Sequence, residues 1–340
     1  MRIDALGAKV ILNLPEGVAR LLCGTPTQDG ARTLDPRLQL LLAAGAASKQ
    51  PRFCDLGVEG ARRHYERVVD AGEAPEPTLA YEVELSVAGM KARFFHPTGR
   101  RSELPCIVYL HGGGFVIGGI GTHLHVARRI SRASGCALLL LDYPLAPESP
   151  FPAALDHCAR AIDEVRERRT PLAIDPSRLA LAGDSAGANL SAVLGPKTNV
   201  QAQLLYYPAT DAGADSGSRR TAAHGFGLET DDVNWFTRQY APSVPMREPR
   251  LSPRWSDDLA GSPPTRLVLA GFDPLRDEGR RFGRALMDAG AYVELVEESE
   301  LIHGFVHMGR LRRAADVVHR DGKRLGDLLR TGVPLTAHEV

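Results

Sequence analysis

The sequence lacks long hydrophobic runs, net charge and paired cysteine motifs, and each absence narrows the class of protein. No run of about 18 apolar residues occurs, so no segment is predicted to span a membrane. The 41 basic and 41 acidic side chains balance, which gives no electrostatic reason to expect a nucleic-acid partner. Without C-x-x-C spacing, free buried thiols and a cytoplasmic location are expected from the five cysteines, Cys23, Cys54, Cys106, Cys136 and Cys158.

Alternating strand and helix patterns are present, with enough apolar residues for a large core. The chain has 340 residues, of which 44% are apolar. After about residue 75, short apolar runs alternate with segments of helical composition, which is typical of an open, mostly parallel sheet flanked by helices. The first two strands have no helix between them and are expected to pair as a hairpin. The predicted strands cover residues 81–87, 91–95, 106–110, 137–141, 179–183, 202–206, 266–270 and 291–297.

One turn between a predicted strand and a predicted helix carries a candidate nucleophile. Residues 183–187 read Gly-Asp-Ser-Ala-Gly, follow the apolar run 179–182 and open the helical segment 188–193. A serine on such a sharp turn has its Oγ exposed, and the flanking glycines permit backbone angles and close packing that a Cβ would penalise. Ser185 is therefore a candidate nucleophile, although a bare G-x-S-x-G also arises by chance in a glycine-rich chain.

A second glycine motif could supply the oxyanion donors that a serine nucleophile needs. Residues 111–115 read His-Gly-Gly-Gly-Phe and directly follow the predicted strand 106–110. Backbone N–H groups exposed by glycines can stabilise the alkoxide of a tetrahedral intermediate. A flexible tight turn would use the same residues, but the position of this motif upstream of the serine turn favours the oxyanion interpretation.

An acid and a base follow at the ends of later predicted strands. Asp273 ends the apolar run 266–272, whereas Asp277 and Glu278 resemble the first turn of the next helix, where carboxylates favour the helix dipole. His303 follows the last predicted strand. The chain order Ser185, Asp273, His303 is the order of α/β-hydrolases.

His303 has two other interpretations. It could pair with His307, four residues later, in a metal site, or it could be an ordinary buried imidazole. A two-histidine site lacks a third ligand of suitable spacing nearby, which weakens the metal reading. His123 and His125 are spaced two apart, face opposite sides of a helix and are weak as a metal site. We predict no metal and no cofactor.

These motifs together resemble the hormone-sensitive-lipase family of bacterial esterases, in its G-D-S-A-G branch. The resemblance runs from about residue 75 to the C-terminus and also includes residues 142–148 (Asp-Tyr-Pro-Leu-Ala-Pro-Glu) and 207–211 (Tyr-Pro-Ala-Thr-Asp). It implies an α/β-hydrolase fold. It also implies oxyanion donors, which in this sequence correspond best to the N–H groups of Gly113, Gly114 and Ala186. The choice among the three glycines 112–114 is left open.

The resemblance also implies a cap over the active site. Two segments fall outside the alternation of strands and helices, residues 1–74 and 213–255, and in the resembled family such pieces meet as a helical cap. The expected organisation is therefore 1–74 and 213–255 as cap and 75–212 and 256–340 as hydrolase core. The alternative is an ordinary helical flank that merely covers the sheet.

The resulting functional expectation is a serine carboxylesterase for short- to medium-chain esters. An amidase or deacetylase could use the same triad. A non-catalytic small-molecule receptor on the same scaffold is the other alternative, but retention of Asp273 and His303 argues for turnover. A small-molecule ester is the expected partner. The sequence names neither the acyl nor the alcohol group, and it leaves a homodimer open.

Overall fold

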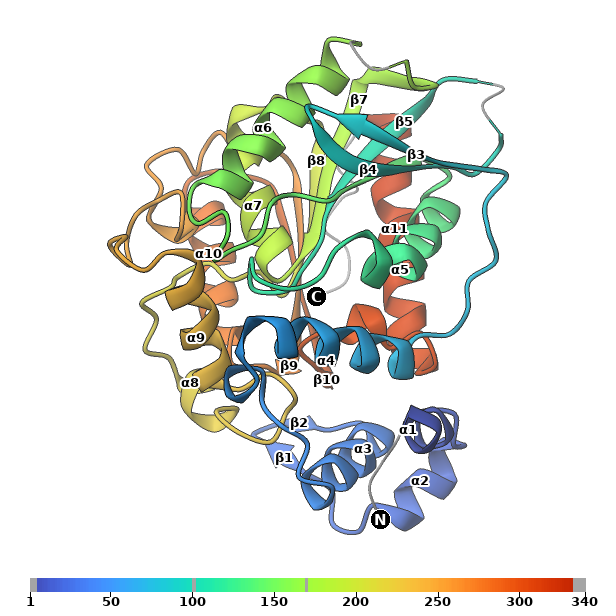
Figure 1. The fold of residues 1–340 in the computed structure, drawn as a ribbon, viewed down its shortest axis with the longest axis vertical. Helices are drawn as coiled ribbons and strands as arrows, with labels where there is room; N and C mark the ends of the chain where they lie inside the picture. Colours follow the sequence, from blue (N-terminus) through green and yellow to red (C-terminus); the bar gives the residue numbers. More distant parts are fainter. Residues whose placement is uncertain (1–4, 100–101, 169–170, 333–340) are drawn as a thin grey trace.

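The computed structural model describes residues 5–99, 102–168 and 171–332 and is built around one eight-stranded sheet. The strand order is β10-β9-β8-β7-β5-β6-β4-β3 (Figure 1). The pairs β3–β4 and β4–β6 are antiparallel, and all other pairs in this sheet are parallel. The strands are β3 (Tyr81–Val87), β4 (Met90–His96), β5 (Leu104–Leu110), β6 (Ala137–Leu141), β7 (Ile174–Asp184), β8 (Ala202–Tyr206), β9 (Thr265–Phe272) and β10 (Val293–Ile302).

Helices cover both faces of the sheet. Helices α5 (Ile120–Ser134) and α11 (Arg312–Thr331) pack on one face, while α6 (Ala153–Arg166), α7 (Ala186–Leu194) and α10 (Arg276–Asp288) pack on the other (Figure 1). A parallel sheet needs such cover on both faces, because its strands are apolar on both sides. The predicted α/β-hydrolase fold with eight strands, including the first hairpin, is confirmed.

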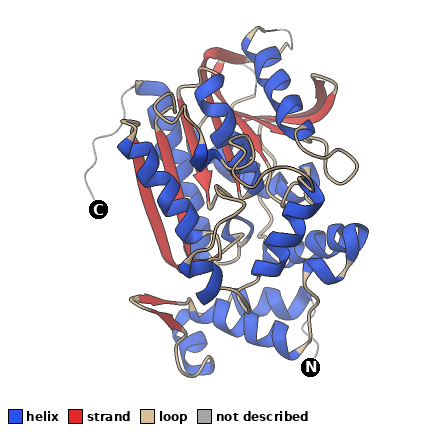
Figure 2. Cartoon of the chain, turned by 90° about the vertical axis from the view of Figure 1, so that its left-hand side faces the viewer, coloured by secondary structure: helices blue, strands red, loops and turns tan. Residues whose placement is uncertain are grey.

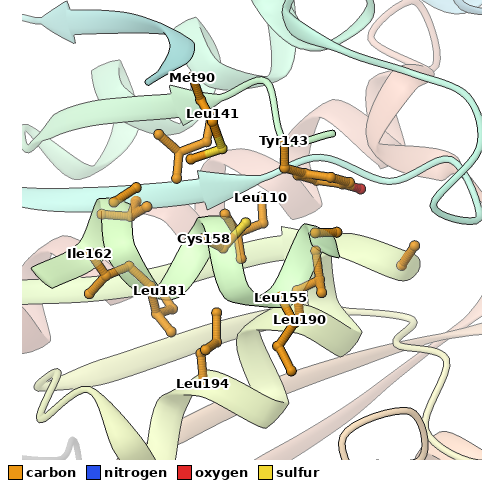
Figure 3. Packing of buried hydrophobic residues seen from close by; sticks show 14 of the residues in the cluster. Met90, Leu110, Leu141, Tyr143, Leu155, Cys158, Ile162, Leu181, Leu190 and Leu194 are labelled. Atoms are coloured by element: carbon orange, nitrogen blue, oxygen red, sulfur yellow. The ribbon is translucent and has the colours of Figure 1, made fainter. Parts of the chain in front are cut away.

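The central strands divide their side chains between two apolar cores. In β5, Ile107 and Tyr109 join the cluster beneath α5 and α11, while Val108 joins the cluster beneath α6 and α7. All three are fully buried. Figure 3 shows the second cluster, with Cys158 of α6 and Leu190 of α7 packed against the sheet. This packing on both faces holds the carboxyl ends of the strands, where the candidate site lies, in fixed positions.

The N-terminal segment forms a helical layer at one end of the molecule (Figures 1 and 2). Asp35 caps the start of its third helix: the carboxylate accepts a hydrogen bond from the Arg37 N–H, and Pro36 fits the first helical position. The Asp35 N–H donates to the Glu300 carbonyl at 3.0 Å and ties the layer to β10. Its elements are α1 (Ala5–Leu12), α2 (Glu16–Leu22), β1 (Gln28–Asp29), β2 (Arg32–Thr33), α3 (Pro36–Ala47), the 3₁₀ turn η1 (Phe53–Asp55) and α4 (Gly57–Gly72).

The second segment outside the alternation contributes α8 (Gly217–Thr221) and α9 (Thr230–Tyr240). Helix α9 contacts η1 of the N-terminal segment. The Cys54 N–H donates to Asp232 Oδ1 at 2.9 Å, and Arg52 pairs with Asp231 at 2.8 Å. The two segments predicted to form a cap are therefore in contact. Residues 1–4 and 333–340, at the ends of the predicted segments 1–74 and 256–340, lie outside the described residues.

None of the described helices is both long and apolar enough to cross a membrane. All five cysteines carry free thiols, but only Cys106, Cys136 and Cys158 are buried. Cys23 and Cys54 are partly exposed, so the expectation of burial was wrong for these two. Both belong to the N-terminal layer, where Cys54 packs at the edge of one core cluster and is only partly covered.

Candidate active site

Ser185 lies on a sharp turn between β7 and α7. Its φ of 52° and ψ of −116° are strained values for a residue with a Cβ. Gly187 permits the turn, because a Cβ there would collide with the Leu110 carbonyl oxygen of the neighbouring strand. Ser185 is partly exposed, whereas Asp184 and Ala186 on either side are buried. The local sequence thus presents one hydroxyl at the carboxyl end of the sheet, as the motif predicted.

His303 bridges Ser185 and Asp273. The His303 Nε2 lies 3.0 Å from Ser185 Oγ, and its Nδ1 lies 2.8 Å from Asp273 Oδ2. Asp273 follows β9 and is fully buried, and its second oxygen accepts from the Leu275 N–H at 2.7 Å. His303 follows β10. Because β7, β8, β9 and β10 are adjacent and parallel, their carboxyl ends bring the three side chains together.

The other carboxylates weighed from the sequence have different partners. Asp277 accepts a hydrogen bond from the Ser218 N–H at 2.8 Å, and Glu278 is a buried partner of Arg219. Both lie in the first turn of α10, as predicted. Asp184 points away from the serine hydroxyl and accepts hydrogen bonds from the Tyr109 hydroxyl and the Gly112 N–H.

The two glycine motifs lie against each other. The Gly112 N–H donates to Asp184 Oδ1 at 3.0 Å and lies 3.3 Å from His123 Nε2. Within the described residues, the N–H groups of Gly113, Gly114 and Ala186 donate no hydrogen bond. Of the three glycines left open by the sequence, Gly112 is thus engaged with Asp184, and the other two have N–H groups available to a ligand.

A buried polar cluster lies beneath these motifs and was missed by the sequence analysis. His123, Asp184 and His307 offer ligand atoms that all lie within 4.8 Å of one another. Burial alone would raise the pKa of the Asp184 carboxyl, but the His123 and His307 imidazoles and the Tyr109 hydroxyl lower it below its ordinary value. Burial lowers the pKa of the His123 imidazole.

The cluster has the residue types of a metal site, but each of its three side chains makes at least one hydrogen bond with a neighbouring protein group. Asp184 Oδ1 accepts from two donors, and His123 Nδ1 lies 2.8 Å from the Thr122 hydroxyl. His307 Nε2 lies 3.0 Å from the Tyr65 hydroxyl. The metal pair of His303 and His307 that the spacing allowed does not form, because His303 binds Asp273 and Ser185 with its two nitrogens.

Aromatic side chains from both outlying segments surround the glycine loop. A Cβ on Gly114 would collide with the Phe236 ring of α9, and the Phe53 ring of η1 lies 5.8 Å from that ring. Trp235 packs edge-on against Phe236 at 5.0 Å, and Phe115 stacks on Tyr240 at 3.9 Å. These contacts place apolar surface from α9 and η1 beside the proposed oxyanion donors.

The family model that matches residues 107–307 is described as the alpha/beta hydrolase fold, and it covers more than half of the chain. The chain belongs to this family. The resemblance to hormone-sensitive-lipase-type esterases that the motifs indicated is thereby confirmed. Of the residues that carry the motifs, Ser185, Asp273 and His303 all fall within the matched range.

This α/β-hydrolase is similar over most of its length to named esterases. It is 35% identical over 327 residues to the carboxylic ester hydrolase LipN of Mycobacterium tuberculosis, covering 90% of this chain and 86% of the relative. It is 32% identical over 294 residues to an ethyl acetate hydrolase of Pseudomonas putida, covering 82% and 92%. A solved ester hydrolase from the Lake Arreo metagenome superposes with a TM-score of 0.82 at 34% identity, covering 88% and 100%.

Proposed function

We propose that this α/β-hydrolase is a serine carboxylesterase that hydrolyses short- to medium-chain carboxylic esters through an acyl-enzyme intermediate. The observation that carries the proposal is the continuous contact from Ser185 Oγ through His303 to Asp273, at 3.0 and 2.8 Å. Both distances lie in the range needed for a base to take a nucleophile's proton and for an acid to orient that base. The named ester hydrolases among the relatives support the same reaction class.

In the acylation step, Ser185 Oγ attacks the ester carbonyl carbon and its proton passes to His303 Nε2. The carbonyl oxygen becomes an alkoxide, which the N–H groups of Gly113, Gly114 and Ala186 stabilise. Asp273 holds the imidazole in the orientation that presents Nε2 to the serine. When the tetrahedral intermediate collapses, the carbon–oxygen bond to the alcohol breaks and His303 returns the proton to the leaving alkoxide.

Deacylation repeats these steps with water as the nucleophile. A water molecule attacks the acyl carbon, His303 Nε2 takes its proton, and the same N–H groups stabilise the second alkoxide. Collapse then breaks the bond to Ser185 Oγ, which receives the proton back from His303. The carboxylic acid leaves and the free serine is regenerated.

Residues 1–74 and 213–255 form a cap that encloses the acyl group. Support comes from the contacts between η1 and α9 and from Phe236, whose ring lies against the Gly114 backbone. A pocket closed by short helices has limited depth, which favours short acyl chains.

The free thiols of the chain support action in a reducing compartment such as the cytoplasm. Size-exclusion chromatography with light scattering decides between a monomer and the homodimer that the sequence left open.

The substitution Ser185→Ala tests the proposed function. It removes one hydroxyl from a partly exposed residue, so the fold is retained and acyl-enzyme formation ends. Triad knockouts of this kind lose on the order of 10⁶ in kcat. The measurement is kcat on a series of p-nitrophenyl esters and on one anilide, which separates an esterase from an amidase. An alanine variant that keeps more than about a hundredth of the wild-type kcat contradicts the proposal.

A further inference from the structure

The loop that carries the oxyanion glycines has a strained backbone. Gly113, Gly114 and Phe115 have consecutive φ values of 120°, 57° and 64°. Glycine adopts such angles freely, but Phe115 carries a Cβ that disfavours them. A conformation of this kind persists only when the surrounding structure holds it in place.

Helix α4 of the N-terminal segment forms hydrogen bonds with the part of the loop that comes after the glycines. Arg62 Nε donates to the Val116 carbonyl at 2.9 Å, and Arg62 Nη2 donates to the Ala146 carbonyl at 3.2 Å. Val116 and Ile117 in turn donate their N–H groups to the Gly113 carbonyl at 3.0 and 2.9 Å. The guanidinium of Arg62 is thus one hydrogen-bonded step from the peptide of Gly113.

The same helix reaches the beginning of the loop through the buried polar cluster. The Tyr65 hydroxyl lies 3.0 Å from His307 Nε2, and this nitrogen lies 4.0 Å from Asp184 Oδ2. Asp184 Oδ1 accepts the Gly112 N–H, which directly precedes the two proposed donors. Glu73, the residue directly after α4, has its Oε1 3.6 Å from the other nitrogen of His307. The hydrogen-bonded contact of α4 with this imidazole is therefore the one from Tyr65.

The buried cluster is well suited to fix Gly112. A Cβ at Gly112 would collide with Asp184 Oδ2, so carboxylate and backbone are already in close contact. The neighbouring imidazoles keep the pKa of Asp184 below its ordinary value despite burial, which favours the ionised form as hydrogen-bond acceptor. Hydrogen bonds to an ionised acceptor are shorter and stronger than those between neutral groups.

We propose that α4 positions the oxyanion hole, with Arg62 and Tyr65 holding the loop that carries Gly113 and Gly114 from its two ends. Both are positioning residues, because Arg62 acts through Val116 and Tyr65 acts through His307 and Asp184. The inference rests on the proposed function, since it assigns a role in stabilising the oxyanion. It also means that the helix belonging to the proposed cap sets the geometry of the catalytic donors.

The test compares three single substitutions on α4. Arg62→Gln removes the contacts with the two carbonyls together with the ion pair to Glu148 at 2.7 Å, and Tyr65→Phe removes only a hydroxyl. The matched control is Arg63→Gln, because Arg63 pairs with Glu59 at the exposed surface, at 3.1 Å. For a short p-nitrophenyl ester, we expect kcat per titrated active site to fall about tenfold in each test variant, with KM within about twofold of wild type. The control keeps the wild-type kcat.

A second readout reports on the oxyanion directly. An aryl trifluoromethyl ketone adds to the serine and places a hemiketal oxygen where the alkoxide forms. Its affinity should fall in parallel with kcat/KM in Arg62→Gln and Tyr65→Phe, because both quantities depend on the donor geometry. Arg62→Lys keeps one donor for the Val116 carbonyl and should recover part of the lost kcat. A merely structural role would lower the Tm without changing kcat per active site.

Two results would overturn the inference while leaving the proposed function intact. One is an unchanged kcat in both test variants alongside an inactive Ser185→Ala. The other is a raised KM with an unchanged ketone affinity, which would assign α4 to substrate binding instead. If Ser185→Ala stays active, the proposed function itself fails, so the two failures are distinguishable.

Discussion

At the scale of single residues, the position of a carboxylate relative to the end of a strand decides whether it can reach the catalytic imidazole. Asp273 follows β9 and contacts His303, whereas Asp277, four residues on, lies in the first turn of α10 and accepts the Ser218 N–H. Both side chains are carboxylates in the same short stretch. Only the one at the strand end reaches the imidazole.

This difference predicts unequal effects of two matched substitutions. Asp273→Asn replaces the oxygen that faces His303 Nδ1, so the imidazole loses the orientation that presents Nε2 to Ser185. We expect kcat to fall about 10⁴-fold. Asp277→Asn should change kcat by less than about tenfold, because its contacts only support the start of α10. Steady-state kinetics on a p-nitrophenyl ester ranks the two, and the reverse ranking would show that Asp273 is not the acid.

Some residues of the site could be predicted from the sequence and others could not. Ser185, Asp273 and His303 each follow an apolar run, and parallel strands bring their carboxyl ends together. His307 lies in a 3₁₀ turn, where the four-residue spacing of an α-helix does not place it on the face of His303. Its hydrogen bond to Tyr65 joins residues 242 positions apart, and no local pattern carries that information.

At the scale of elements, the sequence predicted which long strands are present better than it predicted where they begin and end. The pattern placed β7 at residues 179–183, but the strand begins at Ile174, because backbone pairing with β5 starts at Leu104. The short hairpin of β1 and β2 was missed, since strands of two residues have no periodicity. Helix α5 starts at Ile120, where the Thr122 hydroxyl accepts the Gly119 N–H and closes the first turn.

One buried carboxylate joins three elements and predicts a pH-dependent stability. Glu82 of β3 binds Arg128 of α5 at 2.8 Å, Arg93 of β4 at 3.0 Å and the Leu79 N–H at 2.9 Å. Burial alone would raise the pKa of Glu82, but these partners lower it to about 2. A lowered pKa stabilises the fold above the unfolded-state value, and this contribution is lost as the pH falls toward the folded-state value.

We therefore expect Glu82→Gln to lower the free energy of unfolding by about 2 kcal/mol at pH 7. The difference from wild type should stay constant above about pH 5 and shrink as the pH falls from about 4.5 toward 2. Urea unfolding at several pH values measures it. Glu84→Gln is the control, because Glu84 pairs with the same Arg93 from an exposed position. A pH-independent difference for Glu82→Gln would contradict the assignment.

At the scale of the whole molecule, the fold class was predictable because alternating strands and helices admit few architectures. The role of the N-terminal layer was inferred from resemblance, and it stays a prediction. In this layer, α1 and α2 are short, with eight and seven residues. Each helix exposes a short row of apolar side chains spaced three or four residues apart, namely Leu6 and Val10 on α1 and Val18, Leu21 and Leu22 on α2.

The proposed cap of short helices predicts a preference for small, dissolved esters. Acyl chains of about C2 to C8 should give a higher kcat/KM than chains of about C16, because a pocket beneath short helices accommodates limited length. The rate should rise smoothly with substrate concentration, without a jump when the ester exceeds its solubility. A chain-length series of p-nitrophenyl esters measures both properties. Interfacial activation with a preference for long chains would replace the esterase assignment by a lipase.

The central claim is that Ser185 is the nucleophile of the Ser185–His303–Asp273 triad. Its most direct test is covalent labelling with diethyl p-nitrophenyl phosphate, followed by peptide mass mapping and an assay of the remaining esterase activity. We expect one diethylphosphoryl group per chain, on Ser185, with activity lost in proportion to labelling and no labelling of Ser185→Ala. A label on another residue, or full activity after complete labelling of Ser185, would contradict the claim.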